Sequence, residues 1–336
     1  MNPTVSVIIL NRNDKEYIVD CIRNVLKIRY PYFEIILVDD ASTDGSLELV
    51  QKMFKGCPLL RIISLRKHVG RTNARNIGAL AAKGELLFFL DSDTMVTENS
   101  LEELVKVMKK DIKIGGCQSI ILAIDRKNTP IISSCFLDVY GYPYILRHIP
   151  RQIIQVSYLA GGAMLIRREL VLKLGMFDPY FYYGFEEADL FLRALLNDYK
   201  LYCVPSSIVY HPSTSSTLKK RLSKSQATYY FTRSHITLLI KNYQLYNILK
   251  FGFPYLIFLI LEALYNLIPK RPGVTIAYFR ALNDVVRDLR YILQKRSIVQ
   301  GNIRKVPDKY LIEKGLLLKR CGFVDRIRYV LNKGRN

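Results

Sequence analysis

The sequence predicts an α/β protein in which a mainly parallel sheet carries helices on both faces, followed by a helical, basic C-terminal region. Three observations support this fold class. Short apolar segments alternate with amphipathic segments over the first ninety residues or so. Two of the apolar segments run directly into acid-rich loops, and the charge composition changes sharply after residue 212. Regular alternation of strand and helix is typical of parallel sheets covered by helices.

The N-terminal elements follow from hydrophobic periodicity. Strands are expected at residues 5–10, 33–38, 60–64 and 86–90, where apolar residues run without interruption. Such runs indicate strands buried on both faces of a sheet. Helices are expected between them at residues 16–29, 47–54 and 70–82, and Gly84 is expected to cap the third.

The next hundred residues are less regular. A helix is expected at residues 100–110, a strand at 114–122, irregular structure at 125–152, and a strand after the turn at 161–162. A short helix at 167–174, an aromatic loop at 175–185, a helix at 186–197 and a strand at 201–204 follow. We place the domain boundary at the shift in composition, which gives domains at residues 1–212 and 213–336.

The positive charge belongs to the second domain. Residues 1–212 contain 26 Lys and Arg against 23 Asp and Glu, whereas residues 213–336 contain 24 against 6, a net charge of +18. A segment of this charge favours anionic partners, either nucleic acid or an anionic membrane surface. The sequence has no recognisable nucleic-acid-binding motif, and its apolar segment fits lipid better.

Residues 251–268 form the most hydrophobic part of the chain, with one charge, Glu262, in eighteen residues. A spanning helix needs about 20 residues, so this segment is borderline. Pro254 and Glu262 weaken that interpretation. A helix lying in the membrane interface and a helix buried in a bundle both remain open.

Two features indicate the cytosol. The N-terminus enters a strand directly and shows no secretory signal pattern. The six cysteines are scattered without CxxC or zinc-type spacing, so we expect them to be reduced.

Paired carboxylates follow two of the predicted strands. Asp91 and Asp93 end the strand at 86–90, and Asp39 and Asp40 end the strand at 33–38. Side chains alternate along an extended chain, so Asp91 and Asp93 point to the same side. Hard oxygen ligands suit a divalent cation, and open α/β sheets bind ligands beyond the carboxyl ends of their strands. The alternative for Asp91 and Asp93 is an acidic turn that ends a strand.

Several motifs, in order along residues 4–212, resemble those of the family 2 glycosyltransferases, which have the GT-A fold. They are Val5–Leu10 with Asn11, Val38–Ser46, Ala74–Gly78, Leu90–Thr94, Ala160–Ala163, Gly175–Asp178, Glu186–Leu190 with Arg193, and Tyr210-His211. One DxD pair is weak evidence, but the ordered set is specific. Within the family, the resemblance suggests a rhamnosyltransferase-like subgroup.

The resemblance implies a site for a nucleotide diphosphate sugar and Mg²⁺ or Mn²⁺. Asp93 and His211 are the implied metal ligands, and the cation would offset the charge that develops on the diphosphate. Asp40 would accept a hydrogen bond from the nucleotide base. The full implied donor-binding set is Leu10, Asn11, Asp39, Asp40, Arg71, Arg75, Asp91, Ser92, Gly161 and Gly162.

The resemblance also implies a general base for an inverting transfer. The family usually has Glu-Asp where this chain has Glu186-Glu187, and we expect Glu187 to be the base with one methylene more reach. Glu186, Asp189 and Tyr183 are expected at the acceptor or behind it. Asp189 and Arg193 are four residues apart, which favours a structural ion pair. An acceptor platform and plain loop packing stay equally open for Phe177, Tyr182, Tyr183 and Phe185.

These observations predict a metal-dependent, inverting glycosyltransferase at the cytoplasmic face of the cell membrane. Its donor would be a UDP- or dTDP-sugar and its acceptor a saccharide or lipid-linked saccharide of a cell-surface glycan. One alternative enzyme transfers sugar to polyprenyl phosphate. From another class, the chain would be a non-catalytic nucleotide-sugar-binding or nucleic-acid-binding protein.

Overall fold

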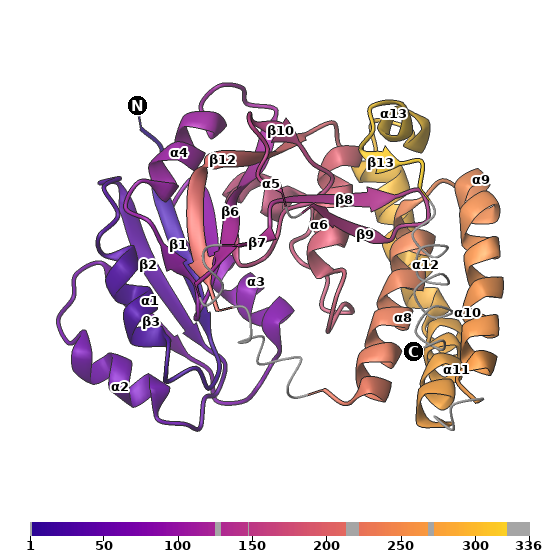
Figure 1. The fold of residues 1–336 in the computed structure, drawn as a ribbon, viewed down its shortest axis with the longest axis horizontal. Coiled ribbons are helices and arrows are strands. Elements are labelled where there is room, and N and C mark those ends of the chain that lie inside the picture. Colours follow the sequence, from indigo (N-terminus) through magenta and orange to yellow (C-terminus); the bar gives the residue numbers. More distant parts are fainter. Residues whose placement is uncertain (1, 125–128, 147, 213–221, 268–271, 321–336) are drawn as a thin grey trace. The chain divides into compact units, whose positions relative to one another are not determined.

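A computed structural model describes residues 2–124, 129–146, 148–212, 222–267 and 272–320 (Figure 1). The chain divides into two compact units. Unit 1 comprises Met1–Cys135, Ile145–Pro179 and Tyr199–Ser215, and unit 2 comprises Phe136–Tyr144, Tyr180–Asp198 and Ser216–Asn336. Unit 2 therefore includes the segment Tyr180–Asp198, which lies within the range 1–212.

Unit 1 is built on a ten-stranded sheet. Its strands are β1 (Val5–Asn11), β2 (Phe33–Asp39), β3 (Leu60–Ser64), β4 (Leu86–Asp91), β5 (Met95–Val96), β6 (Ile114–Ala123), β7 (Pro130–Ile132), β10 (Ile154–Gln155), β11 (Ala163–Arg167) and β12 (Lys200–His211). The main order is β10-β12-β6-β11-β4-β1-β2-β3. Strands β4, β1, β2 and β3 are mutually parallel, as are β6 and β12, whereas β11 runs antiparallel between β4 and β6. The predicted mainly parallel α/β sheet is confirmed.

The register of this sheet brings the two acid-rich loops together. Leu10 pairs with Val38 on one side and with Asp91 on the other, and Asn11 pairs with Asp39. The central strands are buried, as their uninterrupted apolar residues predict. The helices of unit 1 are α1 (Ile18–Val25), α2 (Ser46–Met53), α3 (Arg71–Ala81), α4 (Ser100–Met108) and α5 (Arg168–Lys173).

Two local predictions are wrong. Residues 125–152 are not irregular throughout, because they contain β7 together with β8 (Ser134–Asp138) and β9 (Pro143–Leu146). Strand β8 pairs with its neighbour β9 and with β13 (Leu317–Leu318), which is nearly two hundred residues away. A local pattern cannot show the second partner. Gly84 does not cap α3, which ends at Ala81 with Ala82 as its C-cap. A Cβ on Gly84 would lie 2.5 Å from the backbone nitrogen of Ser6, so the glycine permits a close approach of two backbone segments.

Unit 2 is mainly helical, as predicted for the C-terminal region. Its helices are α6 (Glu186–Leu196), α8 (Lys224–Asn242), α9 (Leu245–Asn247), η1 (Ile248–Gly252), α10 (Phe253–Tyr265), α11 (Pro272–Arg287), α12 (Leu289–Ile298), η2 (Val299–Ile303) and α13 (Asp308–Glu313). Helix α8 is central, since it packs against α6, α11 and α12. Helix α8 begins at Lys224, where Ser223 and Gln226 form a capping box.

The described cysteines agree with the reduced state that the sequence predicts. Cys21, Cys57, Cys117, Cys135 and Cys203 are free. Burial raises the pKa of the Cys117 and Cys203 thiols, the latter to about 11, so both stay protonated and unreactive near neutral pH. Cys321 lies outside the described residues.

Candidate active site

The candidate metal centre lies in unit 1, beyond the ends of β4 and β12. Asp91 is the last residue of β4, Asp93 follows in the turn, and His211 is the last residue of β12. One ligand atom from each of these three side chains lies within 4.8 Å of the other two. His211 Nε2 is 3.1 Å from Asp93 Oδ1. The structure thus brings together the two predicted metal ligands, Asp93 and His211, and adds Asp91.

Two arginines of α3 make the Asp91 carboxylate a stable anion. Burial alone would raise the pKa of Asp91, but the positive charges of Arg71 and Arg75 outweigh it, so the pKa is lowered. Arg71 Nη1 is 3.7 Å and Arg75 Nη2 is 3.9 Å from the carboxylate oxygens. Asp91 therefore stays ionised, beside two cations that could also contact a diphosphate.

The Asp93 carboxylate favours the protonated form of His211. Burial would lower its pKa, but the hydrogen bond to the Asp93 carboxylate raises the pKa to about 8. His211 Nδ1 contacts the Pro212 carbonyl oxygen at 2.8 Å, which orients the ring and directs Nε2 toward the carboxylates. Two carboxylates and an imidazole form a donor set that suits Mg²⁺ or Mn²⁺.

Asp39 and Asn11 hold the second acid-rich loop in place. Both side chains are fully or almost fully buried. Asn11 Nδ2 donates to Asp39 Oδ1 at 2.7 Å and to Ser46 Oγ at 2.9 Å, and Ser42 donates to Asp39 from its backbone nitrogen and its hydroxyl. These hydrogen bonds connect β1, β2 and the start of α2.

Asp40 is oriented by the loop that precedes α3. Its carboxylate accepts hydrogen bonds from the backbone nitrogens of Val69 and Gly70, at 2.7 and 3.1 Å, and lies 2.6 Å from His68 Nδ1. A carboxylate has about four acceptor positions, so one more donor, such as the N–H of a nucleotide base, can be accommodated. Arg12 donates to the carbonyl oxygens of Asp40 and Ala41. Ala41 has a φ of 55°, a strained conformation that this bond helps to hold.

The remaining donor-set residues surround Asp91. Gly162 is buried beside it, and a Cβ at this position would lie 3.5 Å from Asp91 Oδ2. Thr94 Oγ1 donates to the Gly162 carbonyl oxygen at 3.2 Å, while Gly161 lies in the turn before β11. Ser92 is buried and its hydroxyl donates to Asp14, so in this structure Ser92 ties two loops together.

Phe177 packs inside unit 1 and does not belong to an exposed acceptor platform. It is fully buried and lies 5.6 Å, edge to face, from Phe89. The Arg75 guanidinium lies over its ring at 5.4 Å. Asn76 holds the backbone of Phe177 through two hydrogen bonds of 2.7 and 3.0 Å. For Phe177 the packing alternative is therefore correct.

The candidate base lies at the start of α6 in unit 2. Glu186 is buried, whereas Glu187 is partly exposed, which favours Glu187 for contact with an acceptor. The preceding residue, Phe185, has a φ of 70°, and its buried ring stacks on His235 at 4.8 Å. Backbone strain of this kind persists only where surrounding contacts impose it, and here it sets the direction in which α6 begins.

Asp189 forms the structural ion pair that the sequence predicts. Its buried carboxylate accepts from Arg193 Nη2 at 2.6 Å and from Lys241 Nζ at 3.0 Å. Asn242 Nδ2 donates to its other oxygen at 2.9 Å. Burial would raise the pKa of Asp189, but Arg193 and Lys241 lower it to about 2. These bonds fasten α6 to α8.

The tyrosines before α6 remain candidates for acceptor contact. Tyr182 is 38% exposed and its ring lies 4.8 Å from that of Tyr230. Tyr183 is partly exposed, and its carbonyl oxygen accepts from Ser234 at 3.5 Å.

Sequence reasoning missed four contributors to these sites. They are Arg12, Asp14, His68 and Lys241. Each acts on a partner at least twenty-eight residues away, so no local spacing could reveal it.

Comparisons with known proteins agree with this architecture. Residues 6–175 match the family model for glycosyl transferase family 2. The chain is 36% identical over 119 residues to the glycosyltransferase GlyG of Streptococcus pneumoniae, covering 34% of this chain and 40% of the relative. It is 36% identical over 106 residues to the putative teichuronic acid biosynthesis glycosyltransferase TuaG of Bacillus subtilis, covering 32% of this chain and 42% of the relative. The match therefore spans less than half the length of each of these relatives.

A likeness to a solved structure concerns the fold. The crystal structure of GalNAc-T7 with UDP, GalNAc and Mn²⁺ superposes with a TM-score of 0.61 at 23% identity, covering 71% of this chain and 48% of that one. The mainly parallel sheet and the helical region thus define a GT-A-like protein. Since the family model matches just over half of the residues of this chain, the chain belongs to glycosyl transferase family 2.

Proposed function

We propose that the protein is an inverting, metal-dependent transferase that moves a sugar from a UDP- or dTDP-sugar to a saccharide or lipid-linked saccharide of a cell-surface glycan. The observation that carries this proposal is the convergence of Asp91, Asp93 and His211 beyond the ends of β4 and β12. Beside them stand the two arginines of α3 and the Asp40 loop.

Asp93 and His211, with Asp91 close by, would hold Mg²⁺ or Mn²⁺. When bound, the cation supplies Lewis-acid stabilisation of the departing diphosphate. Arg71 and Arg75 would contact the phosphate oxygens, and Gly162 would let the donor approach the backbone closely. Asp40 would accept from the nucleotide base while its own loop holds it in place.

Glu187 would remove the proton from the acceptor hydroxyl. Its position as the second residue of α6 and its partial exposure support this role. Asp189 would act behind it by anchoring α6, since its buried carboxylate is already engaged by Arg193, Lys241 and Asn242. Tyr183 and Glu186 would lie at the acceptor or behind it.

The acceptor class is supported by relatives and by the charge of the chain. One relative is named as a putative glycosyltransferase of teichuronic acid biosynthesis. The basic segment at 213–336 fits work at the cytoplasmic membrane face, where a lipid-linked acceptor is presented. The family match does not distinguish subgroups, so the rhamnosyltransferase-like subgroup is a proposal of its own.

A donor screen with purified protein tests the proposal. Release of UDP or dTDP from a panel of nucleotide sugars would be measured with Mn²⁺, with Mg²⁺ and with EDTA. We expect release with a divalent cation, its loss in Asp93→Asn, and acceptor-dependent acceleration by a lipid-linked saccharide. Acceleration by polyprenyl phosphate alone would support the alternative acceptor instead.

The base assignment has a separate control. Glu187→Gln should abolish transfer while nucleotide binding persists, because the donor site lies in unit 1. Full transfer by Glu187→Gln would overturn the role of Glu187 without affecting the metal site.

A further inference from the structure

The C-terminal unit carries a surface helix with an apolar outer side. Residues Leu245–Tyr265 form one continuous helical stretch of 21 residues. Its most apolar 18-residue window has a mean hydropathy of 1.7 and is 22% buried. Within the described residues it is the one helix long and apolar enough to cross a membrane. The large apolar side chains exposed on it, here called the apolar stripe, include Leu245, Leu249, Phe253, Ile257, Leu261 and Leu264. Lys250 is exposed on the same stretch.

The opposite side of this helix is part of the folded core of unit 2. Tyr255 is 1% exposed, and its ring lies 4.2 Å from that of His235 in α8. Thr275 of α11 donates a hydrogen bond of 2.8 Å to the carbonyl oxygen of Ala263. In Figure 1, α9 and α10 follow one another along a single helical ribbon in this unit. The segment is therefore neither a detached anchor nor a fully buried core helix.

This packing argues against a spanning orientation. Helix α10 is joined to α11, which carries Arg280, Asp284 and Arg287. Carrying α10 through a bilayer would take these charged groups into the hydrocarbon, which is costly. Lying in the plane of the interface, the helix buries its apolar stripe and leaves the rest of unit 2 in water.

Cations lie beside the apolar stripe. Lys250 Nζ lies over the ring of exposed Tyr246 at 5.6 Å. Lys250 also lines a cavity of about 330 Å³ together with Lys319 and Arg320, and none of the described residues that line it is acidic. Three cations at one surface hollow suit the phosphate groups of anionic lipids.

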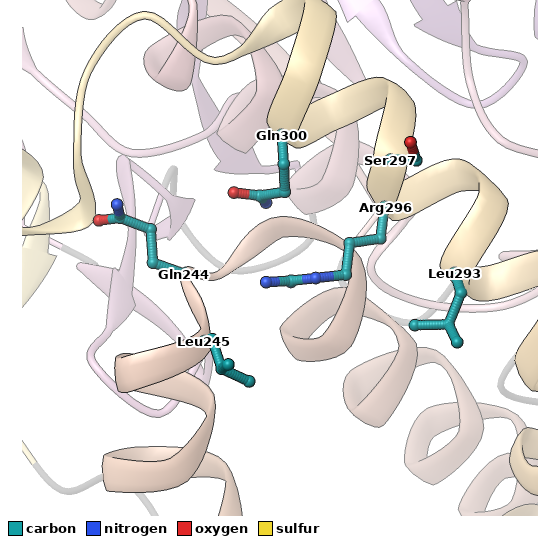
Figure 2. Close-up of a pocket in the computed structure, with 6 residues that line it drawn as sticks. All are labelled: Gln244, Leu245, Leu293, Arg296, Ser297 and Gln300. Atoms are coloured by element: carbon teal, nitrogen blue, oxygen red, sulfur yellow. The ribbon is translucent and has the colours of Figure 1, made fainter.

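A second hollow borders the start of the stripe, next to α12. A cavity of about 460 Å³ is lined by Leu245 at the start of the stripe and by Leu293 of α12. Figure 2 shows Arg296 reaching from α12 between these two leucines. Arg296 donates to the carbonyl oxygens of Ile240 and Tyr243. Its guanidinium therefore supplies hydrogen bonds to carbonyl groups at the C-terminal end of α8. Apart from the two leucines, the residues that line this cavity are polar, so the cavity borders the stripe and does not lengthen it.

We propose that unit 2 docks on an anionic lipid bilayer, with α9, η1 and α10 in the plane of the interface and the apolar stripe inserted among the acyl chains. Charge favours this occupant over a second copy of the chain, because two copies meeting at the stripe would bring their basic hollows together. The inference stands on the surface of unit 2 and does not depend on sugar transfer.

Vesicle sedimentation with the full chain tests the proposal. Vesicles of phosphatidylcholine alone would be compared with vesicles that also contain phosphatidylglycerol. We expect strong binding to the anionic vesicles and weak binding to the neutral ones. The double variant Leu249→Gln, Leu261→Gln should bind at least ~10-fold more weakly, because two inserted leucines are lost. Ile112→Gln in unit 1, where the side chain is 67% exposed, is the matched control and should bind like the native chain.

A second pair of substitutions tests the contribution of the cationic side chains to vesicle binding. Lys250→Gln with Lys319→Gln should weaken binding to anionic vesicles by roughly fivefold per cation and leave binding to neutral vesicles unchanged. Lys52→Gln with Lys55→Gln, two exposed lysines of unit 1, should have no such effect. Matching circular dichroism and melting curves for all four variants would confirm that each one folds.

Three results would overturn the proposal. One is equal binding of the native chain and the leucine variant to anionic vesicles. Another is resistance of the native chain to alkaline carbonate extraction from cell membranes, which would show a spanning helix. The third is a dimer in light scattering that the leucine changes dissociate while vesicle binding persists.

Discussion

Two carboxylates with cationic neighbours, Asp91 in unit 1 and Asp189 in unit 2, are built differently. Asp189 is fully buried, whereas the Asp91 side chain is 18% exposed. Asp189 is bonded by Arg193 at 2.6 Å and by Lys241 at 3.0 Å, with Asn242 on its other oxygen. Around Asp91 the guanidiniums of Arg71 and Arg75 stand at 3.7 and 3.9 Å, beyond hydrogen-bond distance. Both carboxyl groups have a lowered pKa, but only one has its bonds completed by these neighbours.

The difference separates a structural carboxylate from one placed for a ligand. Asp189 gains nothing from an added cation, because protein donors already surround it. Asp91 belongs to a cluster with Asp93 and His211, where like charges are gathered and positive groups stand close by. Like charges held together are costly unless a cation joins them, which is typical of a functional site. The predictions below test this distinction.

The largest effect is expected on catalysis from Asp93→Asn. The change removes a charged ligand at nearly constant shape, so kcat/KM should fall by about 10³-fold. The free energy of unfolding should change by no more than about 1 kcal/mol, because the change also relieves repulsion with Asp91. Steady-state kinetics and urea denaturation measure the two quantities. If Asp93→Asn kept its metal-dependent activity, Asp93 would not be a metal ligand.

A large effect on stability is expected from Asp189→Asn. The change leaves Arg193 and Lys241 buried without their counter-charge, which costs about 3 kcal/mol of unfolding free energy. Urea denaturation monitored by circular dichroism gives the value. The matched control is Glu187→Gln on the same helix, partly exposed, which should unfold like the native chain. Equal stability of Asp189→Asn and the native chain would contradict a structural role.

The free energy of unfolding should depend on pH in the acid range through the same carboxylate. The pKa of Asp189 is about 2 in the folded chain and lies near 3.9 in an unfolded one, so its contribution is complete above the unfolded value and is lost as the pH falls toward 2. The native chain should lose about 2 kcal/mol over that interval through Asp189. Comparing urea denaturation at several acidic pH values with Asp189→Asn isolates this part. A parallel pH dependence in both chains would refute the low pKa.

The smallest effect is expected from Gly162→Ala. The added Cβ would make ordinary van der Waals contact with Asp91 Oδ2 at 3.5 Å, so stability should change by less than about 1 kcal/mol. The added methyl group would meet the donor, so KM for the nucleotide sugar should rise while kcat changes little. Donor-saturation kinetics measure both constants. An unchanged KM would place the donor away from Gly162.

Much of unit 1 could be predicted from sequence because its signals are local. Uninterrupted apolar strands such as Leu86–Asp91 and the acids that follow them are visible as patterns, and the sheet register then brings their ends together. The irregular interpretation of residues 125–152 was wrong because β8 lies between β9 and β13 in a small sheet, and its partner at Leu317–Leu318 is too distant for a local pattern to show. The role of Lys241 at Asp189 was invisible for the same reason, since fifty-two residues separate the two.

The central claim is that Asp91, Asp93 and His211 bind a divalent cation together with a nucleotide diphosphate. Thermal unfolding of the native chain with UDP or dTDP, each with Mn²⁺ or with EDTA, tests it most directly. We expect one of the nucleotides to raise the melting temperature only when Mn²⁺ is present, through mass action on the folded state. The shift should vanish in Asp93→Asn. An equal shift in EDTA, or an undiminished shift in Asp93→Asn, would contradict the account.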